Sequence, residues 1–176
     1  MAITIIILLF SLNVSAPNTE CFYIERVRQV CHYEQMELFT DHLGLKESNN
    51  QWKAINQIGC MGTWQIAPGT LRHFGYGYIT PQSFRQNPDL FPEELQYQIL
   101  LALLKSNEIA LKDYFFYVGQ TIKGVEITKS GLLAASHLGG TGSVKKFLLT
   151  MGAVNKKDVN GTSIKHYLKE FGGYEL

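Results

Sequence analysis

The stretch "LKESNNQWKAINQIGCMGTWQIAPGTL", residues 45–71, holds a single acidic side chain, Glu47, among amides, tryptophans and glycines. The preceding residues 24–43 carry apolar side chains at three- and four-residue spacing and contain no Pro or Gly. This spacing predicts a helix, in one piece or two, that delivers Glu47 at its end.

The chain changes character after this helix. Residues 52–66 form short apolar segments around Gly59 and Gly62, which predicts a small β-hairpin or an irregular excursion. Pro68 then stands at an early position of the next helix, where its missing N–H group costs nothing, and Gly75 ends that helix.

The rest of the chain is predicted to be mostly helical. Residues 99–104 are apolar around the full circumference of a helix, which is typical of a segment buried on all sides. We expect Thr162 or Ser163 to cap the last helix and Gly172 to stop it. The fold class is therefore mainly α, with the hairpin or excursion following the Glu47 helix. The further predicted helices are 92–117, which is the longest, 131–138, 143–150 and 162–171.

Length and composition suit one globular domain. A chain of 176 residues buries roughly 68 to 70% of its unfolded surface. Its net charge is +1, and its Lys and Arg residues are scattered, which argues against a nucleic-acid partner. The five histidines and three cysteines show no zinc-ligand spacing, so we expect neither a metal nor a cofactor. We expect a monomer.

The first residues are predicted to be a signal peptide. Residues 2–12 are an almost unbroken apolar run, and the small residues 14–16 resemble a signal-peptidase site. Residues 1–16 would be removed, leaving 17–176 as a periplasmic or extracellular domain. The run is shorter than the roughly 20 residues of a transmembrane helix, so no stable membrane insertion is expected. No Lys or Arg precedes the run, and the alternative is an N-terminal core segment of a cytosolic protein.

Three cysteines, Cys21, Cys31 and Cys60, leave at least one thiol free or paired with another chain. On one continuous helix, Cys21 and Cys31 would lie roughly 15 Å apart, which exceeds the ~7 Å limit for a disulfide. They can pair only if the helix begins after Cys21.

Glu47 has the setting of a proton donor. The negative end of the helix dipole disfavours an ionised carboxylate there, and apolar neighbours such as Trp52 and Trp64 would desolvate the group. Both effects favour the protonated form, which is what the general acid of a glycosidase requires. The alternative is a solvated helix end without a catalytic role.

Four motifs follow one another from Glu47 onward: Glu47-Ser48, Gly62-Thr63-Trp64-Gln65, Pro68-Gly69-Thr70 and residues 134–142. Their order and spacing resemble the lysozyme-like lytic transglycosylases, the soluble type related to goose-type lysozymes. In that family a helix ends in Glu-Ser, and an excursion leads to Gly-x-Met-Gln or a variant, a Pro-x-Thr helix start, and Ala-Ala-Tyr-Asn-Ala-Gly-x-Gly.

The last helix and one departure complete the resemblance, which runs from about Met36 to the C-terminus. "TSIKHYLKEF", residues 162–171, resembles the closing helix of the family, with Tyr167 at its tyrosine. His137-Leu138 replaces the Tyr-Asn pair of the family. The variant Ala-His-Leu-Gly-Gly resembles a subset of peptidoglycan-degrading proteins of bacteria and phages.

The resemblance implies cleavage of peptidoglycan glycan strands. Glu47 would protonate the bond between N-acetylmuramic acid and N-acetylglucosamine and then act as base, giving a 1,6-anhydro end. No second carboxylate is required, because the substrate's acetamido group can assist. Asp41 would point to another face of a continuous helix. Asp89, Glu93 and Glu94 remain possible partners, and if one is close, hydrolysis is favoured.

We predict that several further residues bind the substrate, and each has a structural alternative. Ser48 would bind Glu47 or the acetamide, or else cap local backbone. Gln65 would read a sugar amide, or be a buried amide. Trp64 would offer a flat face to a sugar, or pack in the core.

The remaining candidates lie in the second half of the chain. Tyr167 would orient the acid or the acetamide, or pack in the core. His137 is favoured as a hydrogen-bonded helix residue over a catalyst. Gly139 and Gly140 would let a glycan approach the backbone, or form a tight interhelical turn. Cys60 is favoured as a small buried apolar residue.

These residues predict a peptidoglycan lytic transglycosylase. The alternatives are a hydrolytic lysozyme (muramidase) and a non-catalytic, peptidoglycan-binding domain of the same fold.

Overall fold

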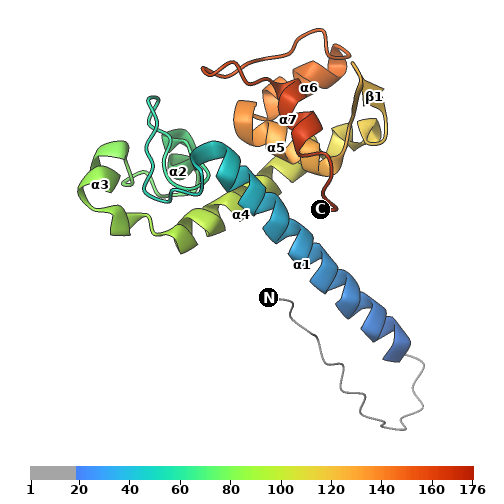
Figure 1. Ribbon diagram of the computed structural model, residues 1–176, viewed down its shortest axis with the longest axis horizontal. Coiled ribbons are helices and arrows are strands. Elements are labelled where there is room, and N and C mark those ends of the chain that lie inside the picture. The colour runs from blue at the N-terminus through green and yellow to red at the C-terminus, as the bar shows by residue number, and fades with distance from the viewer. Residues whose placement is uncertain (1–18) are drawn as a thin grey trace.

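The computed structural model describes residues 19–176, and the predicted signal peptide, residues 1–16, lies outside the described residues. The fold is mainly α, as predicted (Figure 1). Among the described residues no helix combines the length and apolar character needed to cross a membrane. The elements are α1 (Thr19–Ser48), α2 (Pro68–His73), α3 (Pro81–Gln86), the 3-10 helix η1 (Pro88–Leu90), α4 (Glu93–Leu111), the 3-10 helix η2 (Lys112–Tyr117), β1 (Thr121–Ile122), β2 (Val125–Glu126), α5 (Lys129–Gly139), α6 (Thr141–Leu149) and α7 (Ile164–Glu170).

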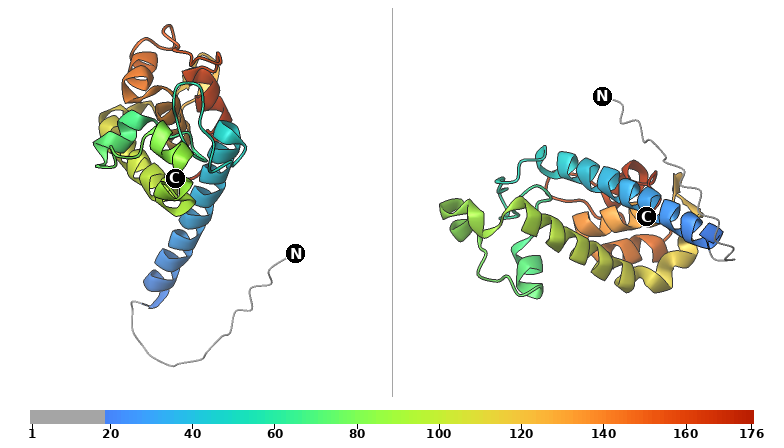
Figure 2. Two further views of the ribbon diagram at one scale, coloured as in Figure 1. Left: turned by 90° about the vertical axis from the view of Figure 1, so that its left-hand side faces the viewer. Right: turned by 90° about the horizontal axis from the view of Figure 1, so that it is seen from below.

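Helix α1 is one continuous helix of 30 residues, and it ends at Ser48. Figure 2 shows its N-terminal half extending beyond the rest of the molecule, and residues 24–34 are exposed. Cys21 and Cys31 lie on this helix, roughly 15 Å apart at about 1.5 Å per residue. This separation along the helix exceeds the ~7 Å limit for a disulfide.

The prediction that residues 92–117 form the longest helix was wrong. Helix α4 ends at Leu111, where the backbone tightens into η2, and α1 is longer. The expectation of burial on all sides also failed, because Ala102 is exposed while Ile99, Leu100 and Leu104 are buried. One face of α4 is exposed to solvent, and the apolar residues 99–104 alone did not indicate which face.

The segment after α1 is an irregular excursion, one of the two predicted forms. Isolated bridges join Ile55 to Met61 and Met61 to Ile66. The two-stranded antiparallel sheet lies elsewhere, where β1 pairs with β2. Lys123 and Gly124 connect these strands and both have positive φ angles, of 52° and 76°. The sequence analysis missed this hairpin because Lys-Gly is a weaker turn signal than Asn-Gly or Asp-Gly.

Helix α5 forms the centre of the second half of the molecule. All of its residues from Ser130 to Ser136 are buried, and α5 packs against both α6 and α7. A Cβ atom on Gly131 would lie 2.7 Å from the carbonyl oxygen of Leu168 in α7, so the two helices approach closely because Gly131 has no side chain. This contact sets the position of α7 relative to the rest of the domain.

Candidate active site

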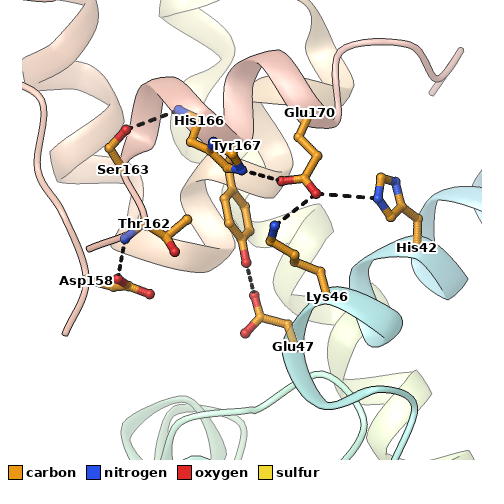
Figure 3. Close-up of polar contacts among 9 residues, drawn as sticks. All are labelled: His42, Lys46, Glu47, Asp158, Thr162, Ser163, His166, Tyr167 and Glu170. Atoms are coloured by element: carbon orange, nitrogen blue, oxygen red, sulfur yellow. Dashed lines mark hydrogen bonds and ion pairs between the residues drawn. The ribbon is translucent and has the colours of Figure 1, made fainter. Parts of the chain in front are cut away.

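Glu47 and Tyr167 meet where α1 ends against α7. The hydroxyl of Tyr167 donates to Oε1 of Glu47 over 2.7 Å, as Figure 3 shows. Glu47 is partly buried, and Tyr167 is only 3% exposed. Burial, with the nearby charge of Glu47, raises the pKa of Tyr167 well above its usual range, so the hydroxyl keeps its proton and acts as the donor.

The cap of α7 places Tyr167. The Ser163 side chain accepts a hydrogen bond from the backbone N–H of His166 and begins the helix, as one of the two predicted caps. Tyr167 follows one turn later on the face that meets α5 and α1. Its ring lies 5.1 Å from that of Phe171, which is fully buried. The tyrosine is thus held by core packing and directed to Glu47 by its hydroxyl.

Ser48 connects the end of α1 to the excursion. Its hydroxyl donates to the carbonyl of Thr63 over 2.8 Å and accepts from the N–H of Gln51 over 2.9 Å. This is the local backbone role that was the alternative to substrate binding. The donor of Ser48 is therefore already used in the free protein.

Gln96 of α4 holds the excursion from the other side, and sequence reasoning missed it. The side chain is fully buried. Its Oε1 accepts from the N–H of Thr63 over 2.8 Å, and its Nε2 donates to the carbonyls of Trp52 and Phe91. A Cβ on Gly62 would overlap this amide, which explains the glycine there. No sequence signal separates Gln96 from the exposed Gln98 two residues later.

Trp64 and Gln65 have different positions. Trp64 is 6% exposed, and its indole N–H donates to the carbonyl of Thr40 over 2.8 Å, so the ring packs in the core. Gln65 is partly buried and has a φ of 48°, in the left-handed region that non-glycine residues rarely adopt. Its amide donates to the carbonyl of Gly62. This backbone strain marks the turn that carries Gln65.

His137 joins α5 to the excursion. Its Nε2 lies 2.7 Å from the carbonyl oxygen of Trp64, and because a carbonyl only accepts, Nε2 carries the proton. This geometry matches the favoured interpretation of a hydrogen-bonded helix residue.

The two candidate glycines form the junction between α5 and α6. A Cβ on Gly139 would lie 2.6 Å from the Cδ1 atom of Ile164, so this glycine permits close packing against α7. Gly140 has a φ of 77° and turns the chain into α6. Gly140 is exposed with open space around its Cα atom. Gly140 is thus the more accessible of the two, since Gly139 is partly buried.

The four carboxylates that the sequence offered as partners of Glu47 fall into two groups. Asp41, Glu93 and Glu94 line a hollow of about 480 Å³ together with Glu37, and Glu47 is not among its lining residues. Asp89 lies in η1. Glu47 therefore does not line the hollow that Asp41, Glu93 and Glu94 share.

Asp158 belongs to neither group, and the sequence analysis missed it. Its charge contributes to the raised pKa of Tyr167, although burial and Glu47 contribute more. Its Oδ1 accepts from the backbone N–H groups of Asn160 and Thr162. These bonds hold the loop before α7.

Cys60 of the excursion also faces the acid. Burial raises the pKa of its thiol, and the charge of Glu47 adds to this effect, while a hydrogen bond to Asn56 opposes it. The thiol is partly buried and unpaired, and Cys31 is exposed and unpaired. No group of three or more His, Cys, Asp or Glu residues in the described range is placed to hold a metal ion.

Comparison with models of protein families gives no match, and comparisons with curated proteins and with solved structures give none either. The function is therefore inferred from the residues themselves.

Proposed function

We propose that this chain is a peptidoglycan lytic transglycosylase in which Glu47 acts first as general acid and then as base. The observation that carries the proposal is the 2.7 Å hydrogen bond from Tyr167 to Oε1 of Glu47. A neutral donor on one carboxyl oxygen fixes the side chain and leaves the other oxygen, Oε2, to meet the substrate. A general acid must be held in this way to reach a glycosidic oxygen.

The proposed reaction has two proton transfers. Protonated Glu47 donates to the oxygen that links the muramic acid C1 to the next sugar, and the bond from C1 to that oxygen breaks. The Glu47 carboxylate then accepts the proton of the muramoyl C6 hydroxyl, while the C6 oxygen forms a bond to C1. The product is a 1,6-anhydro ring, and Glu47 regains its proton. Neither a metal nor a cofactor takes part in this scheme.

The carboxylate distribution supports an intramolecular nucleophile. Residues 49–66 contain no Asp or Glu, so the excursion beside Glu47 offers no second acid. Asp41, Glu93 and Glu94 line a hollow that Glu47 does not line. Since none of these carboxylates is beside Glu47, the substrate's own groups are its natural partners.

Asp158 is the observation that favours the second candidate, a hydrolytic lysozyme. Its charge reaches the hydroxyl that binds Glu47. A carboxylate within about 6.5–9.5 Å of the acid could activate water. Its Oδ1 accepts from two backbone N–H groups that hold the loop, and this structural role is why we place hydrolysis second.

Product analysis on purified peptidoglycan separates these functions. The enzyme is incubated with the polymer, and the released muropeptides are identified by mass spectrometry. Products one water lighter than hydrolysed muropeptides, with 1,6-anhydro ends, are expected. Reducing ends would establish the lysozyme instead, and binding without release would establish the non-catalytic domain.

Export is a separate proposal that rests on the apolar residues 2–12. The mass of the protein recovered from the producing cell tests it. A mature chain that begins close to residue 17, outside the cytosol, is expected. A cytosolic chain that begins at Met1 would contradict it.

A further inference from the structure

Lys46 and Glu47 are neighbours on the last turn of α1, and each has a partner on α7. Nζ of Lys46 lies 3.0 Å from Oε1 of Glu170, while Glu47 binds Tyr167 (Figure 3). Tyr167 and Glu170 are three residues apart, so they lie on the same face of α7. Lys46 and Glu47 are therefore both directed at α7, where each is bound by a different partner.

We propose that Glu170 is a positioning residue for Glu47, because it binds Lys46 and so keeps this ammonium away from the carboxyl group that must carry a proton. The inference rests on the proposed function and adds a control on the charge state of its acid. Glu170 does not touch the substrate in this scheme and acts through Lys46.

The charged and titratable groups around Glu170 and Glu47 come from α1, α7, the excursion, the loop before α7 and the C-terminal segment. Glu170 faces His42 of α1 at 3.7 Å and His166 of α7 at 2.9 Å, besides Lys46. The hydroxyl of Tyr174 in the C-terminal segment binds His42. On the side of Glu47 lie Tyr167, Asp158 and Cys60. Of the groups named here, Lys46 is the one with an ammonium group.

The influence of Glu170 extends to the atom that binds Glu47. Its charge contributes to the raised pKa of the Tyr167 hydroxyl, although burial and Glu47 contribute more. Glu170 and Glu47 therefore share one electrostatic neighbourhood. If Glu170 lost its charge, Lys46 would be released to pair with Glu47, its neighbour in the last turn of α1.

Such a pair would impair the acid. An opposite charge within about 4–6 Å favours the ionised form of a carboxyl group. Glu47 would then lose its proton at lower pH, and the fraction of enzyme able to protonate the glycosidic oxygen would fall. The activity would decline earlier as the pH rises.

The pH profile of kcat/KM on purified peptidoglycan tests this inference. Glu170→Gln is expected to move the alkaline limb about one pH unit lower. Lys46→Met alone is expected to have the same alkaline limb as the wild type. Lys46→Met combined with Glu170→Gln is expected to return to that limb, because the ammonium group that would pair with Glu47 is gone. Restoration of the limb by a second loss is not expected of a merely structural residue.

Two further variants serve as controls for this experiment. Glu170→Asp should shift the limb in the same direction by less, and it serves if Glu170→Gln folds poorly. Glu108→Gln is the matched control, since Glu108 binds Lys105 and Lys129 over 2.8 and 2.7 Å elsewhere on the surface. Its profile should equal that of the wild type.

The outcomes separate this inference from the function beneath it. If the alkaline limb of Glu170→Gln is not shifted, or if the limb of the double variant stays shifted, the proposed role of Glu170 is wrong. The proposed function is not affected by either result. A wild-type protein without turnover, or Glu47→Gln with full turnover, overturns the proposed function and the inference together.

Discussion

Tyr167 donates its hydroxyl hydrogen to Oε1 of Glu47 over 2.7 Å, across a separation of 120 positions in the chain. The tyrosine is buried and the glutamate lies at the end of α1, so the contact fixes where α7 sits relative to α1. The geometry of the proposed acid thus depends on packing in the opposite half of the sequence.

Tyr167→Phe should lower kcat/KM by about 10- to 100-fold. The loss corresponds to this hydrogen bond in the step where Glu47 is the carboxylate base, about 1.5–3 kcal/mol. The matched control is Tyr174→Phe, which removes a 2.8 Å bond to His42 without touching Glu47. Cleavage rates on purified peptidoglycan give the comparison, and equal losses in the two variants would argue against a specific role of Tyr167.

Stability should fall above about pH 10 because of the same tyrosine. Its pKa in the folded protein lies above the ordinary value of 10.0, so the unfolded chain releases this proton first as the pH rises. The contribution is complete below pH 10 and is lost above it. Urea unfolding from pH 8 to 11 should show a steeper decline for the wild type than for Tyr167→Phe. Parallel curves would refute this.

Gln96→Leu should destabilise the protein by about 2–4 kcal/mol, because Thr63 and Trp52 would lose partners for buried backbone groups. The excursion should also exchange its amide hydrogens faster. Gln98→Leu, on the exposed side of α4, should change stability by no more than about 0.5 kcal/mol. Chemical unfolding of both variants measures the difference, and similar values would mean that Gln96 does not hold the excursion.

Gly131→Ala should cost about 1–3 kcal/mol through overpacking. The new Cβ would meet the Leu168 carbonyl oxygen, which is backbone and cannot rotate away. Because α7 must then shift, activity should fall as well. Gly142→Ala is the control, since open space surrounds that glycine in α6. Its stability should be unchanged or slightly higher, and equal destabilisation of both variants would contradict the close contact of α5 and α7.

The sequence predicted the parts of the fold that depend on local pattern. The spacing of apolar residues predicted α1, and Pro68 predicted the start of α2. Ser163 was one of the two predicted caps for α7. The hairpin of β1 and β2 was missed because its Lys-Gly turn and two-residue strands carry little signal.

The site was harder to predict because its contacts are long-range. Glu47 was singled out by its isolation, and Tyr167 by its match to a family motif. Gln96 and Asp158 carry no local mark, since an amide in a helix and an acid in a loop are usually solvated. Trp64 is the opposite case, because the sequence marked it as a candidate for sugar binding, and only the folded chain shows that its ring packs in the core.

The most direct test of the central claim is the turnover of Glu47→Gln on purified peptidoglycan, measured beside its binding to the same polymer. The amide keeps the shape of the side chain but has no carboxyl proton to give. We expect release of 1,6-anhydro muropeptides to fall at least about a hundredfold, with binding and circular dichroism unchanged. Release at the wild-type rate would contradict the account.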